Sequence, residues 1–337
     1  MNDKVLNKKE SVTFFIRNRK VGFSIEKVFT PIMERMKDFC SISISYSPFY
    51  FISLKKIATN LYCAFRARNK QGINHVTGDV HYLLLAMPFC KRVLTIHDLS
   101  FLHKKMNPLK KAFVHLFWFY LPLKCADRVV CISATTRQEL LANYRVSPNK
   151  VSVVYNPIDP VFSFSAKTFH KERPRILHLG TFWNKNLERV IAALDGIPCD
   201  LVVVGELTTE IEQLLQQHTI SCIPKCNLTD QEIVEEYRAC DIVSFPSVFE
   251  GFGMPLIEGQ ATGRIVVTSQ IEPIIEVSGG ACCMVDPTSV SSIREGFLRV
   301  INDDSYRAEK IEAGLKNVKR FGVDTIVEQY RAIYQSI

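Results

Sequence analysis

Two carboxylates, Glu250 and Glu258, lie eight positions apart around a glycine-rich turn. Gly251 and Gly253 carry no Cβ atom, so backbone N–H groups there can approach a ligand closely. Pro255 suits the first turn of a helix, where its missing N–H group costs nothing. A helix N-terminus presents N–H donors and the positive end of a dipole to an anion. A phosphate bound at this turn would have one carboxylate on either side, which fits a sugar nucleotide.

Two further loops carry side chains that can do chemistry at the end of an apolar segment. Lys185 lies in the loop after Arg175 to Gly180, and an ammonium group is a suitable point charge for a diphosphate. His97 follows the apolar run that begins at Val93, and Asp98 comes next. A lone lysine is often solvated, and a histidine at a strand end is more often structural than catalytic. The assignment of a function to Lys185 and His97 therefore depends on the other motifs found in the chain.

The elements that must position these residues are strands alternating with helices. Predicted strands of the first half include Val12 to Arg17, Ser41 to Tyr46 and Arg128 to Ser133. The pattern breaks at Asn156 to Pro160, and the polar segment Ser163 to Pro174 is expected to be an interdomain linker. Alternating strands and helices predict parallel sheets with crossover helices. Ligands of such sheets bind beyond the carboxyl ends of the strands.

The second half repeats the pattern, so the chain is expected to fold as two Rossmann-like α/β domains facing each other across a cleft. We expect the first domain at residues 1–165 and the second at residues 172–337, with the last helix able to pack back on the first. Ile242 to Phe245 is the predicted strand before the Glu250 turn. Thr229 and Glu232 form a capping-box pattern at the start of a predicted helix.

Composition limits the classes of function. The 11 cysteines have no CxxC pairs or zinc spacing, which favours reduced thiols in a cytosolic protein. The N-terminus lacks an apolar signal region, and the longest apolar run, Ala112 to Leu123, is shorter than the roughly 18 residues of a membrane span. Residues 1–170 hold 26 Lys+Arg against 10 Asp+Glu, a net +16, whereas residues 171–337 hold 16 against 24, a net −8. No nucleic-acid-binding motif accompanies the basic half.

The glutamate stretch resembles the E-x7-E signature of the retaining, GT-B-type glycosyltransferases of family 4. The resemblance is specific from about residue 126 to 300, including Asn227 to Asp241 and Val266 to Pro287, and it is weak before about residue 90. The loop Gly180-Thr-Phe-Trp-Asn-Lys-Asn186 resembles the donor diphosphate loop of the same family. Many relatives have an arginine directly after the glycine, where this chain has Thr181, so one phosphate cation is missing and Lys185 or Arg189 must compensate.

The resemblance implies a site, residue by residue. Glu250, Lys185 and His97 would act at the reacting sugar, His97 as a contact to a sugar hydroxyl or a backbone carbonyl. Glu258 would bind the ribose diol of the donor. Further donor contacts are implied at Gly22, Gly180, Thr181, Asn186, Leu228, Gly251, Phe252, Gly253, Met254 and Pro255. No cofactor and no obligatory metal are expected, because the helix terminus and Lys185 would replace a metal at the diphosphate.

The implied activity is transfer of a sugar, in the hexosyltransferase class, from a nucleoside diphosphate sugar to a hydroxyl group. The acceptor would be a glycan or lipid-linked glycan of surface polysaccharide synthesis, bound mainly by the first domain. Two alternatives remain open: a GT-B-type nucleotide-sugar epimerase or hydrolase, and a non-catalytic nucleotide-sugar-binding protein.

The basic first half also bears on location. The segment Leu54 to Arg68 has apolar residues at helical spacing with flanking lysines and arginines, and Lys104, Lys105, Lys110 and Lys111 lie beside the aromatic run Phe113 to Tyr120. A core-facing helix with solvated charges explains the first segment, and docking on anionic lipid is the alternative. We therefore expect a cytoplasmic protein, bound peripherally to the inner face of the cytoplasmic membrane if the second explanation holds.

Overall fold

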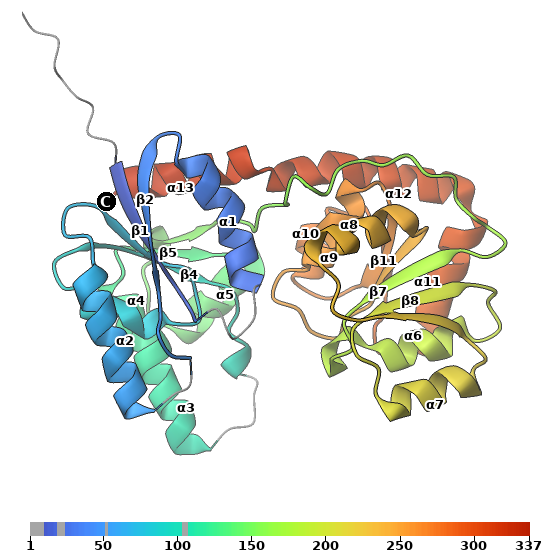
Figure 1. Ribbon diagram of the computed structural model, residues 1–337, viewed down its shortest axis with the longest axis horizontal. Helices are drawn as coiled ribbons and strands as arrows, with labels where there is room; N and C mark the ends of the chain where they lie inside the picture. The colour runs from blue at the N-terminus through green and yellow to red at the C-terminus, as the bar shows by residue number, and fades with distance from the viewer. Residues whose placement is uncertain (1–9, 19–23, 51–52, 103–106) are drawn as a thin grey trace, which may run out of the picture. The chain divides into compact units, whose positions relative to one another are not determined.

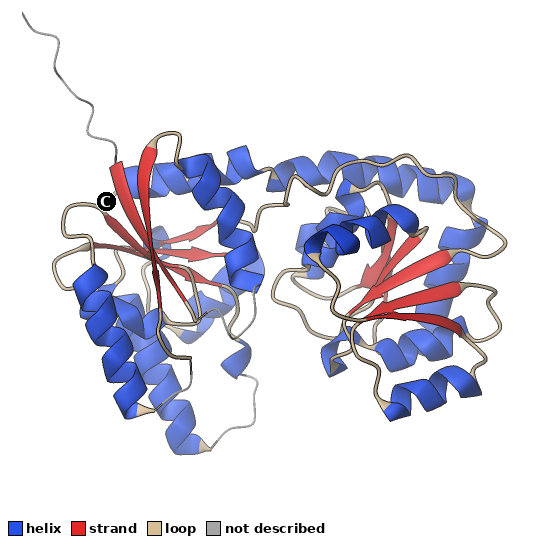
Figure 2. Cartoon of the chain, in the orientation of Figure 1, coloured by secondary structure: helices blue, strands red, loops and turns tan. Residues whose placement is uncertain are grey.

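Two parallel sheets of six strands each form the frame of the chain, as the computed structural model shows (Figure 1). The structure describes residues 10–18, 24–50, 53–102 and 107–337. Within this part of the chain, the first unit consists of the residues up to Pro157 together with Val323–Ile337, and the second unit consists of Ile158–Gly322. In each unit, helices cover the strands (Figure 2). This architecture confirms the predicted α/β fold with two Rossmann-like domains.

The first unit contains the sheet with strand order β2-β1-β3-β4-β5-β6. Its strands are β1 (Glu10–Ile16), β2 (Cys40–Tyr46), β3 (Ile73–Val76), β4 (Lys91–Ile96), β5 (Arg128–Cys131) and β6 (Val151–Val153). Its helices are α1 (Ser24–Met36), α2 (Leu54–Ala67), α3 (Pro108–Val114), α4 (Leu121–Cys125), α5 (Ala134–Asn143) and α13 (Val323–Gln335). Short 3-10 turns at His81–Ala86, Ser100–Leu102 and Pro148–Lys150 and a π-helix at His115–Tyr120 complete it.

The strands of this sheet are apolar on both faces, as expected of a parallel sheet covered on both sides. Phe14 and Val93 belong to the apolar cluster on one face, and Phe15 and Leu94 belong to the cluster on the other face. Neighbouring residues of a strand point to opposite faces, so a strand can contribute side chains to both clusters. The two clusters fix the sheet between its helices, and the loops at the strand ends are left to carry chemistry.

The second unit contains the sheet with strand order β12-β11-β10-β7-β8-β9. Its strands are β7 (Arg175–Leu179), β8 (Asp200–Val204), β9 (Ser221–Lys225), β10 (Ile242–Phe245), β11 (Ile265–Ser269) and β12 (Cys283–Val285). Its helices are α6 (Leu187–Leu194), α7 (Thr209–Gln217), α8 (Asp230–Ala239), α9 (Met254–Ala261), α10 (Ile274–Ser278), α11 (Val290–Asn302) and α12 (Asp304–Asn317). Two short 3-10 turns lie at Trp183–Lys185 and Val318–Phe321.

Local sequence signals placed several of these elements correctly. Strand β10 spans Ile242–Phe245, the predicted range. Helix α8 begins with the predicted capping box, in which the Thr229 hydroxyl accepts from the Glu232 N–H and the Glu232 carboxylate accepts from the Thr229 N–H. Strand β9 was not predicted. Its residues are partly exposed at the edge of the sheet and include Pro224, so they lack the apolar signal of a central strand.

One segment at the domain boundaries differs from the expected division, and the other follows the expectation that the last helix can pack back on the first domain. Residues 163–174, expected as a linker, belong to the second unit: the Ser165 N–H donates to the Thr262 carbonyl at 3.3 Å, and Lys167 pairs with the fully buried carboxylate of Asp241. The last helix, α13, belongs to the first unit because its apolar side, which includes Tyr330 and Tyr334, is buried there against the β-sheet core. The second unit therefore begins at Ile158, before the predicted end of the first domain at residue 165, and it ends at Gly322.

Candidate active site

The loop after β7 is built so that Lys185 folds back over Gly180. Gly180 adopts a left-handed conformation with φ of 89°, and a Cβ atom there would lie 3.1 Å from Cγ of Lys185. Glycine is therefore required both for the backbone conformation and for the space that the lysine stem occupies. The turn closes through the Lys185 N–H, which donates to the Phe182 carbonyl at 2.8 Å. This close packing fixes the lysine beside the end of β7.

Asn186 anchors the same loop from beneath. It has a left-handed φ of 65° and is buried, and its side-chain amide donates to the carbonyls of Pro246 and Pro287, each at 2.8 Å. Its side-chain oxygen accepts from Arg189 at 2.7 Å. Both polar atoms of the Asn186 side chain are thus used within the unit. We infer that Asn186, held by Arg189, fixes the backbone directly after Lys185 and so positions the lysine.

Lys185 and Glu250 meet although they are far apart in the sequence. The ammonium nitrogen of Lys185 lies 2.7 Å from Oε1 of Glu250, and the two side chains are only 19% and 13% exposed. The same nitrogen lies 5.0 Å from the ring centroid of Phe245. Asn184 supports the pair: its side-chain amide donates to the Phe249 carbonyl at 3.1 Å and lies 3.4 Å from Oε1 of Glu250. The loops after β7 and β10 therefore combine opposite charges at one sheltered point.

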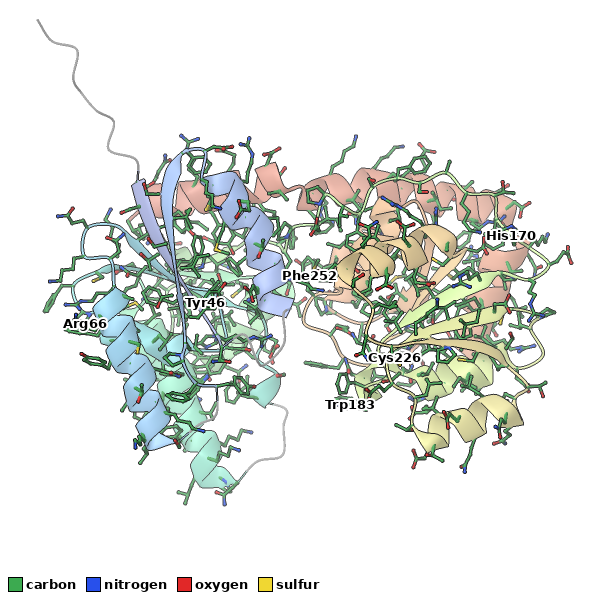
Figure 3. All side chains as sticks on the ribbon, in the orientation of Figure 1. Tyr46, Arg66, His170, Trp183, Cys226 and Phe252 are labelled. Atoms are coloured by element: carbon green, nitrogen blue, oxygen red, sulfur yellow. The ribbon has the colours of Figure 1, made fainter. Side chains whose placement is uncertain are left out.

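The turn from Glu250 into α9 has the predicted form. Gly253 precedes the helix with φ of 106°, and a Cβ atom there would lie 2.6 Å from Cδ1 of Ile274, so no other residue fits without rearrangement. Pro255 lies in the first turn of α9, as expected. Phe252, labelled in Figure 3, is buried, and its ring packs edge-to-face on Phe321 with ring centroids 5.8 Å apart. Its aromatic side chain holds the turn in place, so an anion would meet the backbone of the turn and the N-terminus of α9.

Glu258 is oriented by a tyrosine that the sequence analysis did not single out. The Tyr237 hydroxyl donates to Oε2 of Glu258 at 2.6 Å and lies 3.4 Å from the Pro255 carbonyl. Tyr237 is fully buried, and burial together with the Glu258 carboxylate raises the pKa of its phenol well above the usual value. The phenol therefore stays protonated and donates to the carboxylate. The signal available in the sequence was a tyrosine on the apolar side of α8, which ordinarily indicates only core packing.

His178 is a second residue that the sequence analysis missed. It lies on β7 and is 1% exposed, and its Nδ1 lies 3.2 Å from the hydroxyl of Ser244 on the neighbouring strand. Burial, and then the charge of Lys185, lowers the pKa of His178 to about 3, so the ring is neutral near pH 7. Within the described part of the chain its Nε2 has no hydrogen-bond partner.

The remaining predicted donor contacts are placed as follows. Thr181 packs on the strand-end Gly205, where a Cβ atom would lie 3.1 Å from Cγ2 of the threonine. Gly251, Met254 and Leu228 are half-buried: Gly251 lies in the bend before α9, Met254 is the first residue of α9, and Leu228 lies in the turn between β9 and α8. Gly22 lies outside the described residues, as do Lys104 and Lys105.

His97 belongs to the first unit and follows β4. Its Nε2 lies 2.7 Å from the Thr77 carbonyl, and Gly78, with φ of 128°, leaves room for the ring: a Cβ atom there would lie 2.5 Å from Cδ2. Burial lowers the pKa of His97, so the ring is neutral and the proton is on Nε2, which donates to the carbonyl. Nδ1 is then an acceptor. The ring is suited to receiving a hydroxyl proton in a hydrogen bond.

His97 also lines a cavity of about 580 Å³ in the first unit. The walls combine aromatic rings with polar groups at the carboxyl ends of β3 and β4, and they include Tyr50, Asp79, His81, Asp98, Phe101, Lys110, Trp118 and Phe119. Asp79 pairs with Arg17, and its carbonyl accepts from the Trp118 indole N–H at 2.5 Å. Aromatic walls with a few convergent polar groups are typical of small-molecule sites.

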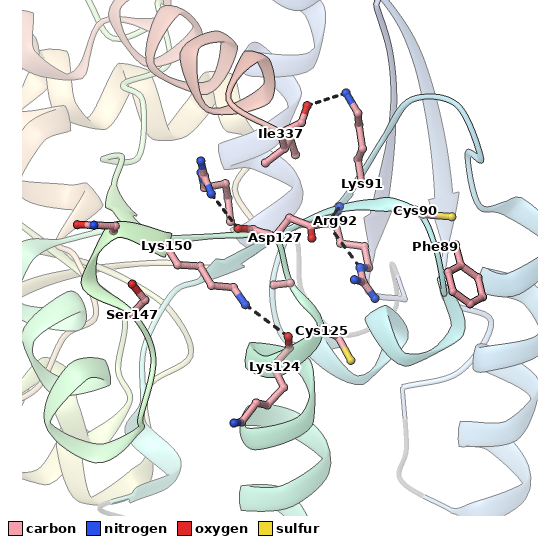
Figure 4. A pocket seen from close by; sticks show the side chains of 13 residues that line it. Phe89, Cys90, Lys91, Arg92, Lys124, Cys125, Asp127, Ser147, Lys150 and Ile337 are labelled. Carbon is pink, nitrogen blue, oxygen red and sulfur yellow. Dashed lines mark hydrogen bonds and ion pairs between the residues drawn. The ribbon is translucent and has the colours of Figure 1, made fainter.

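A wider hollow of about 740 Å³ lies at the opposite, amino-terminal end of the same sheet (Figure 4). Its cations are engaged structurally: Lys91 donates to the Ile337 carbonyl at 2.6 Å, Arg128 to the Ser336 carbonyl at 3.1 Å, and Lys150 to the Leu123 carbonyl at 2.8 Å. These bonds fasten the end of the chain and the end of α4 to the sheet. The hollow is separate from the residues predicted to do chemistry.

Within the described part of the chain, no helix is long and apolar enough to cross a membrane. The same residues contain no group of three or more His, Cys, Asp or Glu side chains that could hold a metal ion.

Two family models match consecutive parts of the chain. The model described as Glycosyltransferase Family 4 matches residues 48–162, and the model described as Glycosyl transferases group 1 matches residues 162–317. The second match contains Lys185, Glu250 and Glu258.

Among proteins, the chain is 23% identical over 251 residues to an uncharacterised glycosyltransferase of Methanocaldococcus jannaschii, covering 73% of this chain and 68% of that protein. It is 33% identical over 100 residues to the O-antigen chain mannosyltransferase B of Escherichia coli, covering 30% of this chain and 26% of the relative. It is 25% identical over 276 residues to the serotype-specific mannosyltransferase WbdA of Escherichia coli, covering 73% of this chain and 34% of the relative. The chain thus spans only about a quarter to a third of these two mannosyltransferases.

Among solved structures, a glycosyltransferase from Rickettsia africae superposes with a TM-score of 0.76 at 17% identity, covering 98% of both chains. Anabaena HepE, solved in complex with UDP and glucose, superposes with a TM-score of 0.76 at 16% identity, covering 97% of this chain and all of HepE. At this level of identity, the similarity establishes the fold that these proteins share.

Proposed function

Because the chain belongs to glycosyltransferase family 4, the glycosyl transferases group 1, we propose that it transfers a sugar from a nucleoside diphosphate sugar to a hydroxyl acceptor and retains the anomeric configuration. One observation carries the proposal. The second unit places a sheltered ammonium–carboxylate pair, Lys185 and Glu250, next to the N-terminus of α9, with Glu258 one turn further on. That set of groups matches a diphosphate with a sugar on one side and a ribose on the other.

The donor would be held as follows. The diphosphate lies against the N-terminus of α9 and the ammonium group of Lys185, both of which attract negative charge. The ribose hydroxyls donate to Glu258, whose orientation the Tyr237 hydroxyl fixes at 2.6 Å. The hydroxyls of the transferred sugar bond to Glu250 and to the backbone at Gly251 and Phe252. The UDP in the HepE structure supports a nucleoside diphosphate donor.

The proposed reaction exchanges one bond for another at the anomeric carbon. The bond from that carbon to the diphosphate oxygen breaks, and a bond to the acceptor oxygen forms on the same face of the sugar. The acceptor proton passes to the departing diphosphate, which carries away the electron pair. Lys185 and the start of α9 stabilise the charge that develops on the diphosphate, and such preorganised groups supply the largest contribution in many enzymes. We propose that no metal ion is obligatory.

The acceptor would bind mainly through the first unit. Its cavity offers aromatic walls and the side chains of Asp79, Asp98 and His97, which can accept hydrogen bonds from sugar hydroxyls. The relative named as the O-antigen chain mannosyltransferase B supports a glycan of surface polysaccharide synthesis as the acceptor class. We propose a lipid-linked glycan at the inner face of the cytoplasmic membrane.

Peripheral docking on that membrane would use the outer sides of α2 and α3. Leu54 and Tyr62 on α2 are 79% and 63% exposed, and Lys55, Lys56 and Arg66 surround them. Leu109 is 82% exposed beside Lys110 and Lys111. Exposed apolar side chains among cations suit a surface of anionic lipid, where each cation contributes about 1 kcal/mol. In flotation assays we expect binding to vesicles with phosphatidylglycerol at low salt and none to purely zwitterionic vesicles; equal binding to both would contradict electrostatic docking.

The transferase proposal is tested by the release of nucleoside diphosphate. We expect a thermal-shift screen of UDP- and GDP-sugars to find at least one that stabilises the protein, because a ligand of the native state raises stability. With that donor, release of the diphosphate should rise when an alkyl glycoside acceptor is added. Release that is independent of any acceptor would indicate a hydrolase, an isomerised donor would indicate an epimerase, and binding without turnover would indicate a non-catalytic protein.

A further inference from the structure

Two large aromatic side chains stand almost fully in solvent on the loop that presents Lys185. Phe182 is 78% exposed and Trp183 is 74% exposed, and neither belongs to the apolar core of the second unit. Figure 3 shows Trp183 at the edge of this unit, projecting from the turn between β7 and α6. Large exposed apolar groups beside a binding site usually mark a contact with a ligand or a partner.

The loop that carries these rings is anchored on both sides. The Lys185 N–H closes the turn on the Phe182 carbonyl at 2.8 Å, and the Asn184 carbonyl accepts from the Val248 N–H at 2.9 Å. Asn186, buried directly after the turn, ties it to the carbonyls of Pro246 and Pro287. A fixed backbone therefore presents the two rings. A binding partner would meet rings that are already in place, and little conformational entropy would be lost on binding.

The neighbours of the rings identify which part of the substrates they would meet. Asn184, the residue after Trp183, donates to the Phe249 carbonyl and lies 3.4 Å from Glu250, so the loop adjoins the Glu250 end of the site. Phe249 is itself 36% exposed and extends the aromatic surface. The proposed donor runs from its ribose at Glu258, past the diphosphate at Lys185, to its sugar at Glu250. Because the acceptor hydroxyl attacks the anomeric carbon on the face that the diphosphate leaves, the acceptor would lie beside the junction of the donor sugar and the diphosphate, next to Lys185 and Glu250.

We propose that Phe182 and Trp183 form an acceptor subsite that stacks on a sugar ring, so that the acceptor is a saccharide and not a simple lipid alcohol; this rests on the transferase function proposed above. The flat apolar face of a pyranose ring presents C–H groups, which pack well on aromatic rings, and its rim presents hydroxyls. A tryptophan and a phenylalanine on a rigid turn supply a large contact area at low entropic cost. The attacking hydroxyl of a sugar held there would lie next to the Lys185–Glu250 pair.

The kinetic test uses the full chain with UDP-glucose and GDP-mannose as donor probes and octyl glucoside, octyl mannoside and n-octanol as acceptor probes. For Trp183→Ala we expect the KM of the alkyl glycoside to rise about tenfold or more, with the donor KM and the acceptor-independent release of diphosphate within about twofold of the wild type. Trp183→Phe should recover most of the loss. The matched control is Phe164→Ala, which removes a ring that is 60% exposed in the same unit but packs on Gly263, after the C-terminal end of α9.

An unchanged acceptor KM in Trp183→Ala, an equal rise in the donor KM, or equal use of n-octanol and the glycosides would overturn the proposal. Loss of vesicle binding with an unchanged acceptor KM would assign the rings to the membrane instead. If the wild type releases no diphosphate with any pair of probes, the transferase function has failed, and the subsite is then tested by binding alone.

That binding test uses the small number of tryptophans in the chain. There are only two, Trp118 in the first unit and Trp183 in the second, so a Trp118→Phe variant reports on Trp183 alone. In this variant, with UDP present, octyl glucoside or octyl mannoside should shift the emission of the exposed indole to shorter wavelength in a saturable manner. A Trp183→Phe variant should lack that component. No saturable shift with either glycoside would overturn the subsite.

Discussion

The two units share one architecture and differ in what their strand ends carry. Both contain a six-stranded parallel sheet. In the first unit, His97 donates to a main-chain carbonyl and lines a cavity with aromatic walls. In the second unit, loops from β7 and β10 bring Lys185 and Glu250 within 2.7 Å, and Tyr237 fixes Glu258. The same sheet architecture therefore allows a site at its carboxyl edge but does not determine the chemistry of that site, which depends on the loops.

The two halves of the chain differ in net charge, and this difference can be compared with the partners proposed for each half. Residues 1–170 carry a net +16 and residues 171–337 a net −8. A basic first half suits an acceptor attached to an anionic membrane. The proposed diphosphate site of the second half needs a cation at the site itself, because the net charge of this half is negative; this makes Lys185 the residue on which the proposed donor chemistry depends most.

The largest effect is therefore expected in the second unit. Lys185→Ala should lower kcat about 10²–10³-fold, the range found when one group that stabilises transition-state charge is removed, and Glu250→Ala should also act mainly on turnover. Steady-state kinetics on the true donor and acceptor measures both. The control is Lys316→Ala, which removes a lysine with a similar 2.6 Å ion pair to Glu312 on the exposed side of α12. Near wild-type turnover in either site variant would refute its assigned role.

A smaller effect concerns stability against pH. The folded pKa of His178 is about 3, below the value of about 6.5 in an unfolded chain, so the unfolded state binds the proton first as the pH falls. The stability that the neutral ring contributes is complete above pH 6.5 and is lost as the pH falls toward 3, amounting to about 1.5–2 kcal/mol between pH 6.5 and pH 5.

Urea unfolding of His178→Gln should show a free energy that falls less steeply over this range. His170→Gln, which replaces a histidine with a side chain that is 66% exposed, serves as the control. His75 of the first unit also has a pKa of about 3 but bonds through both ring nitrogens, to Tyr334 and Thr95. Two buried neutral histidines should thus contribute alike to the pH slope, although only one lies beside the site. An identical slope in His178→Gln and the wild type would argue against the buried neutral ring.

A third prediction compares two buried phenols. Tyr237→Phe removes the hydrogen bond to Glu258 and should weaken donor binding about five- to tenfold, the equivalent of about 1–1.4 kcal/mol. Tyr330→Phe, at a buried tyrosine of the first unit that lies 3.4 Å from Thr95, should leave the donor affinity unchanged. Calorimetric titration with the nucleoside diphosphate measures both. Equal losses in the two variants would show that the effect is one of general stability.

The smallest effect is expected from removal of metal ions. EDTA should leave turnover largely intact, because the start of α9 and Lys185 would stabilise the diphosphate without a cation. Diphosphate release with and without EDTA, followed by addition of manganese, measures this. Loss of activity in EDTA with recovery in manganese would contradict the metal-free mechanism.

The accuracy of the sequence predictions differs between local and long-range features. The capping box of α8 and the range of β10 were predictable because a few neighbouring residues determine them. The pairing of Lys185 with Glu250 was not predictable from spacing, since 65 residues separate them and only the order of β7 and β10 in the sheet brings them together. The role of Tyr237 was hidden for the same reason, because its partner lies on another helix.

The segment boundaries illustrate a second limit. Residues 163–174 are polar and aperiodic, the usual pattern of a linker, yet Asp241 and Thr262 bind them to the second unit through contacts that are distant in the sequence. Asn186 likewise matched a donor-loop motif, but its side chain bonds within the unit, to the Pro246 carbonyl and to Arg189, and no motif specifies these contacts. The identity of a residue indicated where a site would lie, and packing decided what each side chain does there.

The most direct test of the central claim compares Glu258→Ala with His97→Ala in calorimetric titrations of the full chain with the nucleoside diphosphate found in the donor screen. The nucleoside diphosphate is proposed to bind to the second unit alone. Glu258→Ala should therefore weaken binding about ten- to a hundredfold, as expected for loss of hydrogen bonds to a charged group, while His97→Ala changes it by less than about twofold. Unchanged affinity in Glu258→Ala, or an equal loss in both variants, would contradict the assignment of the donor site to the second unit.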